Sequence, residues 1–352
     1  MQKVGRDGRA TVGEVGERAL IALFTAAAAR RSGAEAPAAD GDVVIGSGDD
    51  AAVLRADGPV VVSTDTAVAG RHFRFDWSAP GPIGARAVVQ SAADIAAMGG
   101  NLRGVVVSIG CPPQTPVDRV LALNEGIVEQ THRLGGRVLG GDLVSCPTVI
   151  LTVTSVGTLA GVAPVTLAGA QPGDVLAVSG PLGGAAGGLA VLSAIENGAD
   201  PALAQRFSAL VEDYRLPAPD LSQGPRAARA GARAMTDVSD GLVEELITMS
   251  GASGLALDVA GAAVPRPAGL DELAAELGVD PVRWTLTGGE DHELLAAFAP
   301  GTVPDGWATI GTVSTRVPGD AMAVDDTAAG PAVTVDGAPV TGLRGWQSFS
   351  ET

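Results

Sequence analysis

The chain has 352 residues, 46% of them hydrophobic, and carries a formal net charge of −17 at pH 7. This length and composition predict two ordinary domains, each with its own buried core, and exclude a largely disordered protein. The negative charge argues against DNA or RNA as a partner, because nucleic-acid binders normally present a basic face. Lys3 is the only lysine among the 23 basic residues, so no internal lysine can bind a phosphate or form a Schiff base.

The apolar segment nearest the N-terminus, Ala19 to Ala29, predicts a packed amphipathic helix. It has about half the length that a membrane span requires, and Arg30 and Arg31 follow it. The two cysteines occur without a recognisable signal peptide, so a disulfide framework has no support. We therefore expect a cytoplasmic protein with reduced thiols and no membrane partner.

The N-terminal half begins with a predicted hairpin from Asp42 to Asp65. It should turn at Ala56-Asp57-Gly58, which would set Asp50 opposite Thr64. The other elements expected in this half are a helix from Pro82 to Met98, a strand from Leu102 to Ile109, a helix from Pro116 to Leu134, a strand from Arg137 to Leu139 that ends at Gly140-Gly141-Asp142, and a strand from Val149 to Leu159.

The periodic pattern breaks between Gly161 and Gly173, where we place the domain boundary. Residues 1–160 and 161–352 should form two domains that mix strands and helices, which is an α/β fold of the α+β type. The elements expected in the second half are a strand from Asp174 to Ser179, helices at Gly188 to Glu196, Leu203 to Val211, Leu242 to Ser250 and Leu270 to Leu277, a polar segment from Pro318 to Pro331, and a hairpin from Val333 to Val340.

Aspartates at the ends of predicted strands, beside Gly, Ser or Thr, are the most informative pattern. They are Asp49, Asp50, Asp65, Asp142, Asp237 and Asp240, and Asp94 ends a helix. Facing carboxylates repel each other unless a cation neutralises them. Mg²⁺ takes one or two carboxylates together with water and phosphate oxygens, so acids on several loops suit ions bound to a nucleotide. A single Asp beside Gly is more often turn chemistry, and only the convergence favours a metal site.

Several motifs also have structural interpretations. Ser239 or Asp240 is a candidate N-cap for the following helix, although strand alternation would point Asp237 and Ser239 the same way. The glycine-rich segment from Gly180 to Gly188 follows a strand and opens a helix, but it matches no P-loop, and close packing explains it better. His72 is by default a loop residue. Trp346 either packs on the core or covers a flat heterocycle.

Six motifs follow one another in a fixed order: Gly48-Asp49-Asp50-Ala-Ala-Val, Ser63-Thr64-Asp65-Thr66, Ser91 to Gly100, Gly140-Gly141-Asp142, Asp237-Val-Ser239-Asp240-Gly241-Leu242 and Gly288-Gly289-Glu290-Asp291. In this order they resemble the thiamine-monophosphate kinase family, within the wider group of aminoimidazole ribonucleotide synthetase and selenophosphate synthetase. The resemblance extends from about Gly16 to Phe349.

The resemblance implies transfer of the γ-phosphoryl group of MgATP to thiamine monophosphate, in line and without an assigned catalytic base. It also implies that residues 1–160 bind metal and nucleotide and form a homodimer through their sheet, while residues 161–352 complete the nucleotide and substrate site. By motif position, the magnesium ligands are Asp50, Ser63, Thr64, Asp65, Asp94, Asp142, Asp237 and Asp240, the nucleotide contacts are Gly141, Asp142 and Ser239, and the substrate contacts are His72, Glu290 and Trp346.

Three positions depart from the pattern of the family. Leu167 stands where an arginine is usual, Asp220 where one is common, and His292 where tyrosine is frequent. If residue 167 faces the nucleotide, Leu167→Arg should tighten MgATP binding. Two alternatives stay open, namely another ATP-dependent synthetase of the same fold group and a non-catalytic acidic protein that binds divalent cations.

Overall fold

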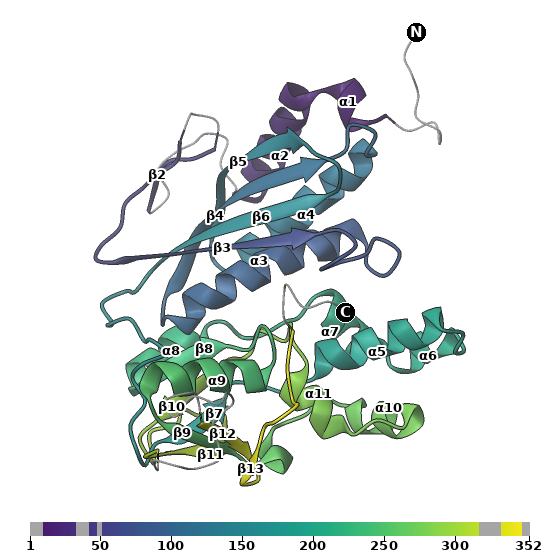
Figure 1. The fold of residues 1–352 in the computed structure, drawn as a ribbon. Coiled ribbons are helices and arrows are strands. Elements are labelled where there is room, and N and C mark those ends of the chain that lie inside the picture. Colours follow the sequence, from purple (N-terminus) through teal and green to yellow (C-terminus); the bar gives the residue numbers. More distant parts are fainter. Residues whose placement is uncertain (1–9, 33–41, 48–50, 317–331, 347–352) are drawn as a thin grey trace. The chain divides into compact units, whose positions relative to one another are not determined.

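The computed structural model describes residues 10–32, 42–47, 51–316 and 332–346. The chain divides into two compact units (Figure 1). The first contains the residues up to Ile95 together with Asn101–Ala160, and the second contains Ala96–Gly100 together with the residues from Gly161 onward. Each unit has its own sheet and its own helices, so each is described by itself.

The first unit is built on a four-stranded sheet. In sheet order its strands are β3 (Val60–Val68), β6 (Ile150–Thr158), β4 (Asn101–Cys111) and β5 (Arg137–Ser145). β4 and β5 run parallel, whereas β6 pairs antiparallel with both β3 and β4. A sheet that mixes both kinds of pairing agrees with the predicted α+β class.

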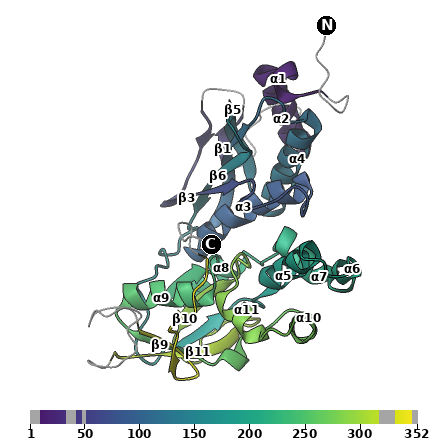
Figure 2. The ribbon, with the colours of Figure 1, turned by 45° about the vertical axis from the view of Figure 1, so that its right-hand side comes forward.

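Helices cover one face of this sheet. They are α2 (Glu17–Ser32), which follows the short α1 (Val12–Val15), α3 (Pro80–Ala97) and α4 (Val117–Arg133) (Figures 1 and 2). Side chains alternate along a strand, and Leu151 and Val153 of β6 point to this covered face and are fully buried. Ser91 of α3 donates a hydrogen bond to the carbonyl oxygen of Val153, 3.1 Å away. The two predicted helices and the strands predicted at Leu102 to Ile109 and Val149 to Leu159 are thus confirmed within a few residues, whereas the strand predicted at Arg137 to Leu139 extends to Ser145.

The apolar N-terminal segment forms α2, as predicted, and buries Leu20 completely, but the helix is not amphipathic, since Ile21 and Leu23 are 39% and 45% exposed. Within the described ranges, the structure contains no helix whose length and apolar character would let it span a membrane.

The predicted hairpin from Asp42 to Asp65 is wrong. β1 (Val43–Ile45) pairs with β2 (Val53–Leu54), whereas β3 pairs with β6 over all nine of its residues. The long ladder with β6 satisfies far more backbone N–H and C=O groups than the two residues of β2 could. The proposed pairing of Asp50 with Thr64 is lost with the hairpin, because Thr64 lies opposite Thr154. Asp49 and Asp50 lie outside the described residues.

The second unit has a seven-stranded sheet in which only the pairing of β12 with β9 is parallel. In sheet order the strands are β13 (Ala338–Pro339), β12 (Ala332–Val335), β9 (Ala256–Val259), β11 (Ala308–Ser314), β7 (Val175–Val178), β10 (Leu294–Phe298) and β8 (Ala234–Asp237). The predicted C-terminal hairpin is confirmed as β12 and β13. The polar segment from Pro318 to Pro331 lies outside the described residues.

Both faces of this second sheet are buried, because successive residues of its strands enter different cores. Leu176 and Val178 of β7 join one apolar cluster, and Ala177 between them joins another. The helices of the unit are α5 (Gly184–Glu196), α6 (Ala202–Arg206), α7 (Ser208–Arg215), α8 (Gln223–Ala230), α9 (Leu242–Ser253), α10 (Leu270–Leu277) and α11 (Pro281–Thr287), with a 3₁₀ turn at Gly261–Ala263.

One predicted helix of the second unit is interrupted. The stretch from Leu203 to Val211 splits into α6 and α7 at Phe207, whose ψ of 36° lies outside the helical range. Phe207 is buried at this break. Burial of one large ring therefore overrides the continuous helical pattern that the sequence predicts.

Helices α3 and α4 of the first unit approach so closely that the contact requires glycine. A Cβ on Gly84 would lie 2.1 Å from the carbonyl oxygen of Leu123, and one on Gly126 would lie 2.0 Å from that of Gly81. At position 81 itself, the nearest atom to a Cβ is 3.8 Å away. The backbones of the two helices therefore touch at these positions.

We predict that Gly84→Ala destabilises the protein by about 1–3 kcal/mol, because the new methyl group must push two backbones apart. Gly81→Ala on the same helix is the matched control and should be neutral or slightly stabilising, since alanine favours a helix. Chemical denaturation of both variants measures the difference. Equal free energies of unfolding for the two variants would contradict the close contact.

Two acidic clusters as the candidate active site

The first acidic cluster consists of Ser63, Asp65 and Asp94. Ser63 and Asp65 are two residues apart on β3, so both side chains point to the face that α3 covers, about 7 Å apart along the strand. Asp94 lies in the last turn of α3, as predicted, and its Oδ2 accepts a short hydrogen bond from the Ser63 hydroxyl. A hydroxyl from the strand and a carboxylate from the helix therefore meet, and Asp65 lies on the same face of β3.

Two other predicted ligands of this half lie on the opposite face of the sheet. The Thr64 hydroxyl is 3.0 Å from that of Thr154, on the face away from α3. Asp142 is level with Ser108 on that same face, and its Oδ1 accepts a hydrogen bond from the backbone N–H of Leu143. β5 is three strands from β3, or about 14 Å at ordinary strand spacing. The structure therefore brings neither Thr64 nor Asp142 to the first acidic cluster.

Gly140-Gly141-Asp142 was expected to end a strand, but it lies in the middle of β5. Gly141 faces the helices, and a Cβ there would be 2.0 Å from the carbonyl oxygen of Val107. The glycine is thus required by the close approach of β4, whatever else it contacts.

His72 lies in the loop that follows β3. Its Nδ1 accepts a hydrogen bond of 3.0 Å from the backbone N–H of Val68, so Nδ1 carries no proton and the ring is held in one orientation. Beside it, the Arg74 guanidinium lies 4.0 Å from the ring centre of Trp77, which rigidifies the same loop.

The second acidic cluster, in the other unit, is formed by Asp237, Asp240, Glu245 and Glu290 around His292. The Nδ1 of His292 is 3.0 Å from Asp237 Oδ2, and its Nε2 is 3.6 Å from Glu290 Oε2. Burial disfavours the imidazolium, but the contacts and charges of Asp237 and Glu290 outweigh it and raise the pKa of His292 to about 10. His292 therefore supplies a positive charge inside an otherwise acidic group.

The remaining acids of this cluster repel one another. Burial, followed by the charges of Glu290 and Asp237, raises the pKa of Asp240. Burial and the charge of Asp237 raise the pKa of Glu245 to about 7. The second acidic cluster thus holds more negative charge than His292 can offset, which is the electrostatic signature of a cation site.

The segment from Ser239 to Gly241 does not cap α9 as expected. The N-cap is Gly241, with φ of 113°, and no side chain caps the helix. Glu245, one turn into the helix, instead accepts hydrogen bonds from the Ser239 hydroxyl at 3.3 Å and from the backbone N–H of Asp240 at 3.2 Å. The N-cap prediction for Ser239 or Asp240 is wrong, because Glu245 already engages both residues.

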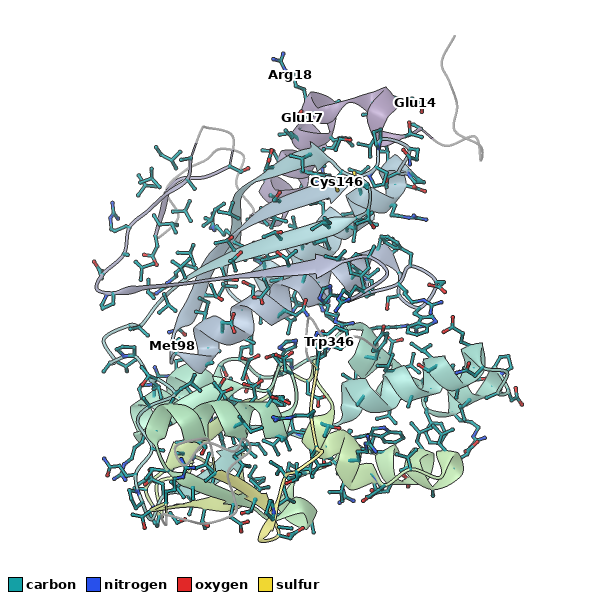
Figure 3. All side chains as sticks on the ribbon, viewed as in Figure 1. Glu14, Glu17, Arg18, Met98, Cys146 and Trp346 are labelled. Carbon is teal, nitrogen blue, oxygen red and sulfur yellow. The ribbon has the colours of Figure 1, made fainter. Side chains whose placement is uncertain are left out.

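Trp346 reaches the second acidic cluster through its backbone. Its N–H donates to the carbonyl oxygen of Asp240 at 2.9 Å, and the N–H of Gly345 donates to Glu244 Oε1 at 3.0 Å. The Trp346 side chain, labelled in Figure 3, is 39% exposed. A large ring therefore stands at the exposed edge of the acids rather than in the core.

Glu290 and His292 are held in strained backbone conformations. Their φ angles are 74° and 55°, values that non-glycine residues rarely adopt. Backbone N–H groups of the two residues donate to the carbonyl oxygens of Ser239 and Val238 at 2.7 and 3.0 Å. Such strain persists only where surrounding contacts impose it, and it is common at functional sites.

At the start of α5, backbone N–H groups of the glycine-rich segment bind a side chain of the protein itself. Asp291 accepts hydrogen bonds from the N–H groups of Gly183 at 2.6 Å and Ala185 at 2.9 Å. Burial is the main reason why the pKa of Asp291 rises to about 7. Sequence reasoning did not find this role for Asp291, although it correctly rejected a P-loop. The segment binds an internal carboxylate where a P-loop would bind phosphate.

The Leu167 side chain is partly buried. It packs against the apolar cluster that contains Leu176 and Leu242. Arg233 forms an ion pair of 2.6 Å with the buried Asp174. Leu167→Arg would place a guanidinium beside this apolar cluster, and its effect on MgATP binding stays a prediction.

Neither cluster is a ready-made metal cage. Across the described ranges, no three His, Cys, Asp or Glu side chains lie close enough together to hold an ion by themselves. Mg²⁺ does not need such a cage, because it retains water and takes phosphate oxygens along with one or two carboxylates. The sparse oxygen donors and the excess negative charge fit magnesium on a nucleotide better than a structural zinc or calcium ion.

Comparison with known proteins gives consistent matches. Residues 48–159 match the family model "AIR synthase related protein, N-terminal domain", and residues 171–303 match the corresponding C-terminal domain. The chain is 45% identical over 312 residues to thiamine-monophosphate kinase of Mycobacterium tuberculosis, which covers 88% of this chain and 87% of that protein. Identity to the Corynebacterium glutamicum enzyme of the same name is 39%, covering 91% and 92%.

A solved structure of thiamine-monophosphate kinase from Stenotrophomonas maltophilia has a similar fold. The TM-score is 0.75 and the sequence identity 27%, and the match covers 90% of this chain and 96% of the other.

The raised pKa of Glu245 predicts a pH-dependent stability. The folded protein holds this proton up to about pH 7, whereas a free Glu loses it near 4.5, so ionisation of Glu245 weakens the fold as pH rises between these values. In chelator-treated protein, Glu245→Gln should be more stable than wild type by roughly 1–3 kcal/mol at pH 8 and should lose this advantage below pH 5.

The exposed Glu272→Gln serves as the control and should change the free energy of unfolding by less than about 0.5 kcal/mol at either pH. Urea titrations at pH 5 and pH 8 provide the comparison. A Glu245→Gln variant that is less stable than wild type at pH 8 would show that the carboxylates of the second acidic cluster do not repel one another.

Proposed function

Because this chain belongs to the thiamine-monophosphate kinase family and carries both AIR synthase related domains, we propose that it transfers the γ-phosphoryl group of MgATP to thiamine monophosphate, giving thiamine diphosphate and ADP. The observation that carries the proposal is the first acidic cluster, in which Asp94 and Ser63 are joined beside Asp65. These are the donors that a magnesium–nucleotide complex requires.

We propose that Asp65, Asp94 and Ser63 in the first unit, and Asp237 and Asp240 in the second, hold magnesium on the phosphates of ATP. When bound, magnesium would neutralise the charge that develops on the transferred phosphoryl group. The hydrogen bond between His292 and Asp237 Oδ2 holds this carboxylate in one orientation, so that it is already placed when a metal ion binds. Asp50, Thr64 and Asp142 remain predicted ligands.

The proposed chemistry needs no general base. A phosphate monoester has a second pKa near about 6, so the acceptor oxygen is already mostly anionic at neutral pH. The protein then has to position two anionic substrates, ATP and thiamine monophosphate, and to offset the repulsion between them. We propose that Gly141, Asp142 and Ser239 contact the nucleotide and that His72, Glu290 and Trp346 contact thiamine monophosphate. The exposed Trp346 ring, anchored at Asp240, suits a flat heterocycle.

We further propose that the protein forms a homodimer through the sheet of the first unit and works in the cytoplasm. Val60, Val62 and Val106, on the sheet face opposite α3, are 49%, 60% and 40% exposed. A row of exposed valines on a sheet is favourable only when another surface covers it. The two cysteines are free, which agrees with a reducing compartment. Sedimentation showing a monomer at micromolar concentration would reject the dimer.

The direct test is product formation. Purified protein with MgATP and thiamine monophosphate should give thiamine diphosphate and ADP in equal amounts, as measured by chromatography. Free thiamine should be a poor acceptor, because its neutral hydroxyl needs a general base, whereas the phosphate of thiamine monophosphate does not. No product beside an active control enzyme would reject the function, and MgATP binding without turnover would favour a non-catalytic cation-binding role.

Removing one acid of the first acidic cluster should stop the reaction without unfolding the protein. Asp94→Asn can still accept the Ser63 hydrogen bond, yet it loses the charge that attracts magnesium, so kcat/KM should fall by about a hundredfold or more. Asp57→Asn, in the exposed turn before β3, removes the same charge and should leave turnover unchanged. Near-normal turnover of Asp94→Asn at limiting magnesium would exclude Asp94 as a ligand.

A further inference from the structure

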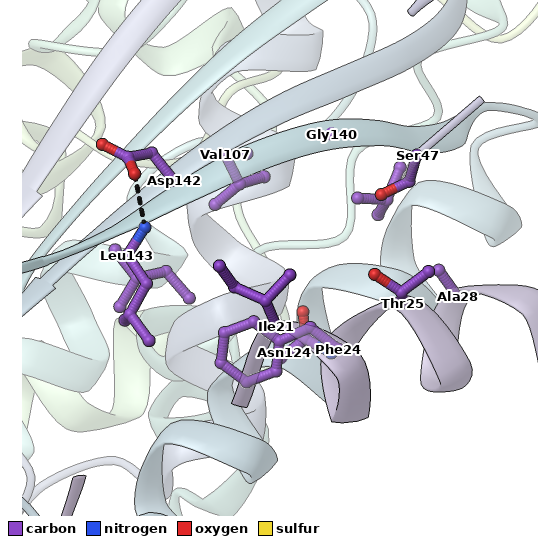
Figure 4. A pocket seen from close by; sticks show the side chains of 13 residues that line it. Ile21, Phe24, Thr25, Ala28, Ser47, Val107, Asn124, Gly140, Asp142 and Leu143 are labelled. Carbon is purple, nitrogen blue, oxygen red and sulfur yellow. Dashed lines mark hydrogen bonds between the residues drawn. The ribbon is translucent and has the colours of Figure 1, made fainter. Parts of the chain in front are cut away.

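Two glycine-rich segments of the chain could surround a ligand, and they differ in what they contact. In the first unit, Gly140 and Gly141 line a cavity of about 70 Å³ beside Asp142, at the proposed nucleotide site (Figure 4). In the second unit, the segment from Gly180 to Gly188 opens α5, and its backbone N–H groups contact the carboxylate of Asp291. The second segment therefore binds part of the chain itself.

Asp291 caps α5 from a distant part of the chain. Its side chain is buried, its Oδ2 accepts from the Gly183 N–H at 2.6 Å, and its Oδ1 accepts from the Ala185 N–H at 2.9 Å. The first N–H groups of a helix have no partner within it, and a negative charge there is favourable. Gly183, the N-cap of α5, has no side chain that could accept these hydrogen bonds. The carboxylate of Asp291 thus connects the start of α5 to the loop that bears this residue.

Asp291 lies in the loop from Gly288 to Glu293, whose side chains alternate in direction. Those of Glu290 and His292 belong to the second acidic cluster, whereas that of Asp291 between them points to α5. The backbone N–H groups of Glu290 and His292 donate to carbonyl oxygens in the segment that bears Asp240. The loop is therefore held from two sides, by the segment of the acidic cluster and by the start of α5.

The strained backbone of this loop needs the contact at Asp291. Glu290 and His292, on either side of Asp291, have φ angles of 74° and 55°, which lie in the left-handed region. Such angles persist only where other contacts impose the conformation. The two hydrogen bonds of Asp291 lie at the centre of the strained segment and are shielded from water, so they are well placed to hold it.

Glu290 depends on this backbone more than Asp237 does. The Glu290 side chain is 29% exposed, and its carboxylate is 3.6 Å from His292 Nε2. Asp237, by contrast, lies in β8 and pairs with Leu294 of β10, so the strand ladder holds it in place. Loss of the Asp291 contact should therefore displace Glu290 and leave Asp237 in position.

We infer that Asp291 is a positioning residue: by capping α5, it holds the loop from Gly288 to Glu293 in the conformation that presents Glu290 to thiamine monophosphate. The inference rests on the proposed kinase function, in which Glu290 contacts the acceptor. The glycine-rich segment from Gly180 to Gly188 is then the fixed point to which this loop is attached. Asp291 acts through Glu290, because its own carboxylate is buried against α5.

Kinetics measured for each substrate separately test this role. Asp291→Ala removes both hydrogen bonds, so KM for thiamine monophosphate should rise roughly ten- to a hundredfold, as is usual for residues that orient a binding group. Asp291→Asn keeps one acceptor oxygen and should give a smaller rise. KM for ATP should change by less than about twofold in both variants, because Asp237 stays in place.

Asp213→Asn is the matched control. Asp213 of α7 also lies at the start of α5, since a Cβ on Gly184 would be 2.7 Å from its Oδ2. Within the described part of the chain, Asp213 accepts no hydrogen bond from the loop that bears Glu290. Asp213→Asn therefore removes the same charge beside the same helix and should leave both KM values unchanged.

Hydrogen exchange measured by mass spectrometry reports on the loop without any turnover. The backbone N–H groups of Glu290 and His292 are hydrogen-bonded, and they should exchange faster in Asp291→Asn and Asp291→Ala than in wild type. Exchange of the β10 residues from Leu295 to Phe298 should not change. Asp291→Asn carries this measurement if Asp291→Ala fails to fold.

The outcomes separate the positioning role from the kinase function. A rise in KM for thiamine monophosphate alone, with faster exchange of the loop, supports the role of Asp291. An active kinase whose two KM values are unchanged in both variants, or are raised equally, would overturn this role and leave the kinase function intact. If the wild type forms no thiamine diphosphate, the kinase function fails. In that case faster loop exchange in Asp291→Asn supports the anchoring of the loop, and unchanged exchange overturns it.

Discussion

Repulsion between carboxylates is the constraint on which the rest of this structure depends. Asp240 and Glu245 have raised pKa values because acids surround them in a partly buried place, and His292 offsets only part of that charge. A flexible scaffold would relieve the repulsion by moving the acids apart. Keeping the carboxylates close together therefore requires rigid secondary-structure elements, and both units contain such elements.

The rigid elements have a common origin in close backbone contacts. In the first unit, glycines at positions 84 and 126 let α3 and α4 touch, and α3 carries Asp94. In the second unit, a Cβ at Gly289 would lie 2.5 Å from the carbonyl oxygen of Ser239, so the loop before Glu290 rests directly on the segment that bears Asp240. These glycines thus support the site indirectly, because the close backbone contacts that they permit prevent the charged side chains from moving apart.

The sequence predicts local structure and residue identity well and long-range pairing poorly. Helical periodicity locates α3, α4, α9 and α10, and the ordered motifs include Ser63 and Asp94, which a hydrogen bond joins in the structure. The partner of β3 lies about ninety residues further along the chain. A nearby turn at Asp57 offers a plausible but incorrect alternative, and no local pattern can choose between them.

The sequence also could not predict the roles of residues that depend on burial in the tertiary structure. Asp291 looks like a turn acid, yet it fills the N-terminus of α5, because Gly183 and Ala185 of another element lie beside it only in the fold. Its role depends on three-dimensional neighbours, which neither spacing nor composition encodes.

Strand β3 of this chain is sensitive to insertions and deletions. One of its faces bears Ser63 and Asp65, and the other bears Val62 and Thr64. Adding or deleting a single residue before Ser63 would exchange the two faces, so that valine entered the acidic layer and carboxylate entered the apolar one. We therefore expect length changes in this part of the chain to be tolerated only in the loops outside the strand.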